Sequence, residues 1–111
     1  MELTTHSEAD VKVIEISGTL DSSNVGEFRE KFLEESNHED RIVLDCSALD
    51  YLDSSGLATL VNIFKNLSAR EIPLVICGFS EGILRVIEFT NLDKVFKLAG
   101  SLEEALAAAK S

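Results

Sequence analysis

The 111-residue chain contains no tryptophan, one proline, two cysteines and two histidines. It has no apolar run near the roughly 18 residues that a membrane span needs, and its first residues lack the basic and apolar regions of a signal peptide. We therefore expect a soluble, cytoplasmic protein that does not associate with membranes. Cys46 and Cys77 each lie in an apolar run, where a thiol behaves as a small hydrophobic group, so we expect both to be structural.

Basic side chains are scarce as well. The sequence has 10 Lys and Arg against 20 Asp and Glu, a formal net charge of −10. A phosphate backbone or an anionic bilayer is repelled by such a chain on average, so direct binding to DNA or RNA is not expected. A chain of this length with 45% apolar residues can bury a core without disulfide bonds, and we expect one domain over residues 1–111.

The first half of the chain predicts two strands, a helix and a third strand. Val11 to Ile16 partly alternates apolar and polar residues, and a weaker edge strand is expected over residues 1–7. Asn24 followed by Glu27 is typical of a capped helix start. The helix after it carries one apolar face, formed by Val25, Phe28, Phe32 and Leu33, and Arg41 to Cys46 is a short buried strand.

The second half predicts three more helices. After a loop over residues 50–53, one helix is indicated by apolar residues at helical spacing: Leu57, Leu60, Val61, Phe64 and Leu67. Pro73 ends it, a buried strand follows over residues 74–77, and Ser80 opens the next helix. A short strand is expected over residues 95–98, and a terminal helix begins at Ser101. The order β-β-α-β-α-β-α-β-α predicts an α/β fold with a mostly parallel sheet and an antiparallel edge strand.

The run Asp53-Ser54-Ser55-Gly56-Leu57 places two hydroxyls beside a carboxylate at an expected helix start. A hydrolase nucleophile elbow needs glycine two residues before and two residues after the serine, and neither serine satisfies this. The only histidines, His6 and His38, lie in segments that do not point to this loop. The pattern therefore does not support acyl-transfer catalysis, and we expect no catalytic residues.

Phosphate-binding and metal-binding motifs are missing too. No glycine-rich nucleotide loop occurs, and the single glycine of the serine loop is surrounded by acidic residues that would repel a nucleotide. Asp45 lies near a strand end, as in receiver domains, but the acidic pair and the lysine of that chemistry are absent. We therefore predict neither a cofactor nor a metal site.

Two roles remain for the serine pair. Asp53 or Ser54 can cap the helix by accepting hydrogen bonds from free amides of its first turn. Capping does not require two hydroxyls, so the second serine needs another explanation, and phosphorylation provides one. A phosphate dianion at a helix amino terminus is stabilised by unpaired N–H groups and by the positive end of the helix dipole.

The same residues resemble a known family. The chain resembles the STAS domain of bacterial anti-sigma factor antagonists over nearly its whole length. Three segments carry this resemblance: Ser17 to Asp21, Ile42 to Ser47 and Asp53 to Leu57. In that family the first serine of the D-S-[SA]-G-[LI] run carries the regulatory phosphate, which corresponds to Ser54 here. Ala58 stands where the family often has glycine, but it is still a small residue.

The resemblance implies a partner switch. The unphosphorylated protein would bind an anti-sigma factor that is also a serine kinase, and so free a sigma factor. Phosphorylation of Ser54 would end that binding, and a PP2C-type serine phosphatase would restore it. The chain would then be a ligand and a substrate rather than an enzyme.

We expect one partner surface, with Ser80 as its weakest member, because the loops of parallel strands meet at one sheet edge. Its residues are Asp21, Ser22, Asn24, Asp53, Ser54, Ser55, Gly56, Leu57 and Ser80. For Asp21 to Asn24, simple helix capping is an equally good interpretation. Two other functions stay open: a STAS subunit of a signalling or lipid-transport assembly that no kinase visits, and a small-ligand or nucleotide-binding module.

Overall fold

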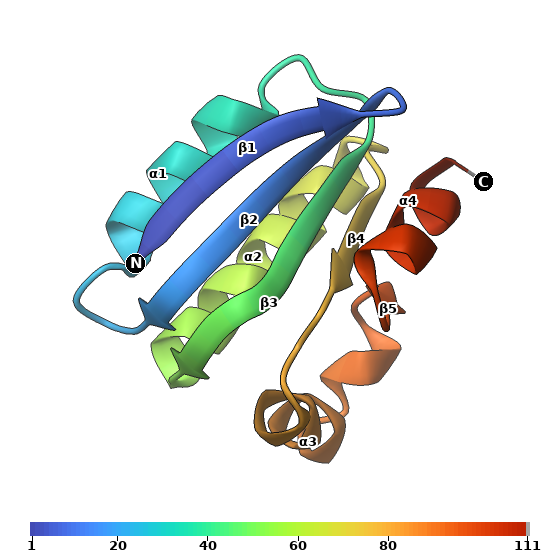
Figure 1. Ribbon diagram of the computed structural model, residues 1–111. Helices are drawn as coiled ribbons and strands as arrows, with labels where there is room; N and C mark the ends of the chain where they lie inside the picture. The colour runs from blue at the N-terminus through green and yellow to red at the C-terminus, as the bar shows by residue number, and fades with distance from the viewer. Residues whose placement is uncertain (111) are drawn as a thin grey trace.

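A five-stranded sheet with helices on both faces forms the body of the protein (Figure 1). The computed structural model describes residues 1–110. The strands are β1 (Glu2–Glu8), β2 (Val11–Leu20), β3 (Ile42–Leu52), β4 (Leu74–Cys77) and β5 (Leu98–Ala99). The helices are α1 (Val25–Ser36), α2 (Ser54–Ala69), α3 (Glu81–Phe89) and α4 (Leu102–Lys110), and a single 3₁₀ turn, η1, spans Leu92–Lys94.

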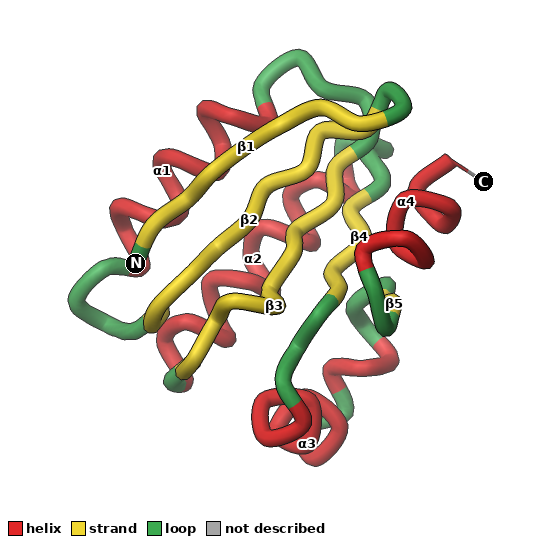
Figure 2. Tube along the Cα trace, viewed as in Figure 1, coloured by secondary structure: helices red, strands yellow, loops and turns green. Residues whose placement is uncertain are grey.

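The strands lie in the sheet in their order along the chain (Figure 2). β1 pairs with β2 antiparallel, and every later pair is parallel. The predicted α/β class with an antiparallel edge strand is therefore confirmed. Parallel pairing also brings the carboxyl ends of β2, β3 and β4 to one edge, where α1, α2 and α3 begin.

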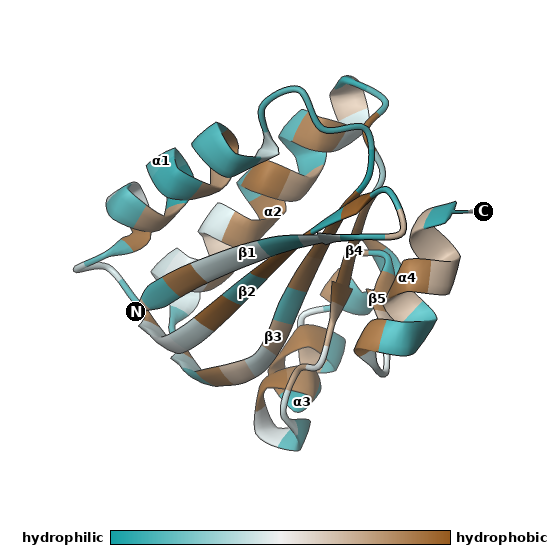
Figure 3. Cartoon of the chain, turned by 45° about the horizontal axis from the view of Figure 1, so that its top comes forward, coloured by the Kyte–Doolittle hydropathy of each residue, from teal (hydrophilic) through white to brown (hydrophobic). Residues whose placement is uncertain are grey.

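The two faces of the sheet have different cores. The face covered by α1, α2 and α3 packs large side chains, among them Phe28, Phe32 and Leu60. The face covered by α4 packs small ones, such as Val13, Val75 and Ala105. The hydrophobic sides of the helices face the sheet, and the outer side of α1 is hydrophilic (Figure 3). The periodicity seen in the sequence thus reflects real packing.

The two cysteines lie in these two separate cores, Cys46 in the core of large side chains and Cys77 in the core of small ones. Burial raises the pKa of the Cys46 thiol well above its usual value. Burial and the nearby Asp45 carboxylate raise the pKa of Cys77 to about 12. Both thiols are therefore protonated at neutral pH, in keeping with a structural role.

Three strand boundaries were predicted wrongly. β2 was expected over Val11 to Ile16, but it continues to Leu20. β3 continues to Leu52 where a loop was expected over residues 50–53, because β2 also continues and pairs with it through two register shifts, near Ser17 and near Gly18. The last strand was expected over residues 95–98, but it is Leu98–Ala99. A left-handed Asn91 starts η1, and the amides of Val95 and Phe96 bond to the Leu92 carbonyl, so residue 95 is not free to pair.

Candidate functional site

The serine loop lies where β3 passes directly into α2. β3 ends at Leu52, Asp53 is extended, and α2 begins at Ser54. Leu20, the last residue of β2, pairs with Leu52. The loop that follows β2 therefore leaves the sheet beside the start of α2, as expected from the sequence.

Asp53 connects these two loops. Its Oδ1 accepts a hydrogen bond from the Gly56 amide at 2.8 Å, which caps α2, and its Oδ2 accepts one from the Ser22 amide at 3.2 Å. Its own backbone amide donates to the Leu20 carbonyl at 3.2 Å. One half-buried carboxylate thus holds the start of α2 against the loop after β2.

Ser54 is the first residue of α2, and it is exposed. Among residues 1–110 its hydroxyl has no hydrogen-bond partner, because Asp53 already caps the helix. Ser55 is half-buried. Of the two capping residues left open by the sequence, Asp53 is the one used, and the Ser54 hydroxyl faces solvent at a helix amino terminus.

Gly56 and Leu57 fix the position of the helix start. Gly56 is buried, and a Cβ added there would lie 2.6 Å from the Leu20 carbonyl oxygen and 2.6 Å from Leu52 Cδ1, so only glycine fits. Leu57 packs partly against the core of large side chains. The first turn of α2 is therefore held closely against the ends of β2 and β3.

The loop after β2 is closed by its own polar side chains. The Asp21 carboxylate accepts hydrogen bonds from the Ser23 amide, at 2.9 Å, and from the Ser23 hydroxyl. These bonds, the hydroxyl's first, hold the pKa of Asp21 below its ordinary value of 3.8. The Ser22 side chain is exposed, so this loop also presents a hydroxyl to solvent.

The prediction that the Asn24 side chain caps α1 was wrong. Asn24 stands at the N-cap position, but its side chain makes no capping bond. Its Oδ1 instead accepts from the Asp21 amide at 3.0 Å, and its Nδ2 donates to the Thr19 carbonyl at 2.9 Å. The loop doubles back on itself, so the nearest partners of this side chain precede it in the chain.

Ser80 caps α3, and its hydroxyl accepts from the Ile83 amide at 3.3 Å. It also lines a groove of about 290 Å³ between the end of β3 and α3, together with Asp50, Tyr51, Leu52, Gly82, Ile83 and Val86. The groove therefore adjoins the strand that leads into Ser54. Tyr51 and Val86 were not among the predicted site residues, although an aromatic residue in an expected loop was a signal for Tyr51.

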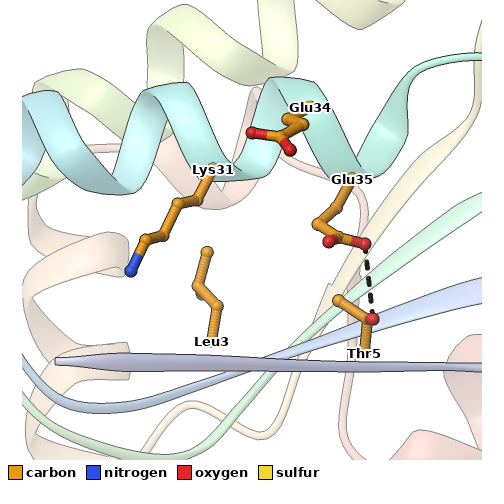
Figure 4. A pocket seen from close by; sticks show the side chains of 5 residues that line it. All are labelled: Leu3, Thr5, Lys31, Glu34 and Glu35. Atoms are coloured by element: carbon orange, nitrogen blue, oxygen red, sulfur yellow. Dashed lines mark hydrogen bonds between the residues drawn. The ribbon is translucent and has the colours of Figure 1, made fainter.

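A second pocket, of about 300 Å³, lies between β1 and α1 (Figure 4). It is lined by Leu3, Thr5, Lys31, Glu34 and Glu35. Glu35 accepts a hydrogen bond from Thr5 at 3.4 Å and pairs with Lys12 at 3.4 Å, and Lys31 pairs with Glu27 at 2.9 Å. Glu35 and Lys31 thus have partners within the fold, and the two carboxylates, Glu34 and Glu35, disfavour a phosphate ligand.

No cluster of three or more His, Cys, Asp or Glu side chains among residues 1–110 is placed to hold a metal ion. Within the same residues, no helix has the length and apolar character needed to cross a membrane.

Comparison with known proteins bears on the family of this chain. The family model of the STAS domain matches residues 2–105. An anti-sigma-B factor antagonist of Listeria monocytogenes is 32% identical over 85 residues, which cover 75% of this chain and 74% of that protein. The Bordetella bronchiseptica protein BtrV is 29% identical over 112 residues, covering 100% of this chain and 97% of that protein.

Solved structures show the same fold. The crystal structure of an anti-sigma factor antagonist from Mycobacterium paratuberculosis has a TM-score of 0.90 at 25% identity, and the match covers 99% of this chain and 94% of that one. The family model covers almost the full length, from β1 into α4. This chain therefore belongs to the STAS domain family.

Proposed function

We propose that this protein is an anti-sigma factor antagonist controlled by phosphorylation of Ser54. In its unphosphorylated form it binds an anti-sigma factor serine kinase in the cytoplasm, and the sigma factor held by that kinase is released. Phosphorylation of Ser54 ends the binding, and a PP2C-type serine phosphatase restores it. The chain acts as a ligand and a substrate, not as an enzyme.

The single observation that carries this proposal is the free hydroxyl of Ser54 at the start of α2. The side chain is exposed and has no hydrogen-bond partner among the described residues, since Asp53 caps the helix. A kinase can therefore reach it without opening the fold. The names of the relatives, anti-sigma-B factor antagonist among them, support the same assignment.

Electrostatics explains how one phosphate ends binding while the fold survives. A phosphate of about −1.5 to −2 charges at a helix amino terminus is favoured within its own chain by roughly 0.3 to 2 kcal/mol. Facing a like charge of a partner at ~5 Å, each unit charge costs about 3 kcal/mol at an effective dielectric near 20. That is on the order of a hundredfold in affinity, so docking is lost while the domain stays folded.

The surface for the kinase consists of Asp21, Ser22 and Asn24 in the loop after β2 and of the segment Asp53 to Leu57. Asp53 joins these segments through the Ser22 amide, so they form one continuous surface rather than two separate loops. Ser80 lies at its border, on the groove beside β3.

A displacement assay tests the proposal. The kinase and the sigma factor of the same organism are mixed and titrated with this protein, and the free sigma factor is measured. We expect release by the unphosphorylated protein, no release after incubation with ATP, and renewed release after phosphatase treatment. Release that ATP leaves unchanged would contradict the phosphorylation switch and favour an interaction subunit that no kinase modifies.

A further inference from the structure

Four large apolar side chains are exposed within residues 1–110: Tyr51, Val86, Phe89 and Val95, with exposed fractions of 55%, 48%, 88% and 39%. Two of them, Tyr51 and Val86, line the same groove. Tyr51 lies near the end of β3, Val86 and Phe89 lie on α3, and Val95 follows η1. Exposed apolar residues scattered singly need no explanation, but a group in one region indicates an interaction site.

A groove organises this region. Tyr51 and Leu52 of β3 form one side of it, and Gly82, Ile83 and Val86 of α3 line the other. Gly82, Val86 and Phe89 recur at helical spacing, so they lie on the same side of α3. The apolar surface therefore continues from the groove along the helix to its end.

The groove is continuous with the surface around Ser54. Leu52 lines the groove and also touches the first turn of α2, since its Cδ1 lies 2.6 Å from where a Cβ of Gly56 would be. Ser80, at the start of α3, lines the groove as well. A partner that covers Ser54 and extends toward α3 therefore also covers the groove.

The charge beside the groove indicates the kind of partner. Asp50 lines it, is exposed and has no ion-pair partner within residues 1–110. The nearest base on the helix, Arg85, is paired with Glu81 at 2.9 Å. The groove thus fits an apolar side chain flanked by Lys or Arg. A second copy of this chain, with its net charge of −10, brings like charge instead.

We propose that this groove receives an apolar side chain, flanked by basic residues, of the same anti-sigma factor kinase. The inference rests on the proposed function and divides its surface into two parts. Ser54 is the part that phosphorylation switches. The groove is an anchor that supplies affinity and does not touch the reacting hydroxyl.

The test changes the groove alone. Burial of one apolar anchor is worth roughly tenfold to a hundredfold in affinity, so the double variant Val86→Ala/Phe89→Ala should bind the purified kinase at least about tenfold more weakly. Gly82→Leu should weaken binding similarly by filling the groove, since nothing lies within 4 Å of a Cβ at Gly82. In phosphorylation of Ser54, KM should rise about tenfold while kcat stays within about twofold.

Matched controls separate the possible results. Ala107→Leu adds the same side chain at an exposed position of α4, on the other face of the sheet, and should bind like the wild type. If the double variant binds normally while Ser54→Asp does not, the groove proposal is overturned and the proposed function stands. If the wild type neither binds nor is phosphorylated, both fail. Dimerisation that Gly82→Leu abolishes would assign the groove to a second copy and overturn the proposal.

Discussion

Helices α2 and α3 both begin with a capping side chain, but they leave different groups free. At α3 the cap is Ser80, and its hydroxyl is occupied by the Ile83 amide. At α2 the cap is the carboxylate of Asp53, and the serine comes one residue later with its hydroxyl unoccupied. A helix start therefore presents a serine for modification when the residue before that serine performs the capping.

The largest difference between the two helix starts should appear when a negative charge replaces each serine and the affinity for the kinase is measured. Ser54→Asp places a carboxylate on the kinase surface, and we expect a loss on the order of a hundredfold in affinity with the fold retained. Ser80→Asp keeps a capping side chain, so we expect a change within about fivefold. Titration calorimetry with the kinase measures both. Equal losses would show that the two helix starts do not differ in function.

Replacing the glycine in the first turn of α2 or of α3 should change the free energy of unfolding in opposite directions. Gly56→Ala forces a Cβ against the Leu20 carbonyl, and we expect destabilisation of about 1 to 3 kcal/mol. Gly82→Ala at α3 meets open space and should stabilise the protein by about 0.5 to 1 kcal/mol. Urea denaturation followed by circular dichroism gives both values. A tolerated Gly56→Ala would contradict the close packing of α2 against β2.

Removing the capping side chain of α2 or of α3 should produce a smaller difference in stability. Asp53→Ala removes two hydrogen bonds, to the Gly56 and Ser22 amides, and we expect a loss of about 1 to 2 kcal/mol. Ser80→Ala removes one and should cost about 0.5 to 1 kcal/mol. Thermal unfolding compares them, with Asp53→Asn as a control that keeps an acceptor oxygen. If the two alanine variants are equally stable, Asp53 does not hold the two loops together.

The smallest expected effect is on the stability of the protein at acid pH, and it depends on Asp21. Because the hydrogen bonds from Ser23 lower the folded pKa of Asp21 below 3.8, its contribution is present above that pH and is lost as the pH falls through the folded pKa. The stability difference between wild type and Asp21→Asn should therefore shrink as the solution is acidified below pH 3.8. Ser23→Ala should return the pKa of Asp21 toward 3.8, and NMR titration of the carboxyl carbon detects this.

The elements of the fold were predictable because burial imposes a period on the sequence. Leu60 and Leu67 repeat at helical spacing since one side of α2 packs on the sheet, and Leu74 to Cys77 is apolar since β4 is covered on both faces. The end of β3 was missed because its pairing to Leu52 depends on two register shifts with β2. Neither shift leaves a pattern in β3 itself.

The candidate site was predictable in part because its main residues are adjacent in the sequence. The sequence Asp-Ser-Ser-Gly contains the cap, the exposed hydroxyl and the residue that must lack a side chain, all within one turn. The bonding of Asn24 was not predictable, because it depends on where the Thr19 carbonyl lies after the chain turns back. The groove was not predictable either, since Tyr51 and Val86 meet only through the packing of α3 beside β3.

The most direct test of the central claim is the position of the phosphate. The purified protein is incubated with the cognate kinase and ATP, and the modified residue is mapped by mass spectrometry, with Ser54→Ala and Ser80→Ala as matched controls. We expect one phosphate on Ser54, present in Ser80→Ala and absent in Ser54→Ala. A phosphate on Ser55 or Ser80, or none in the segment that begins α2, would contradict the account.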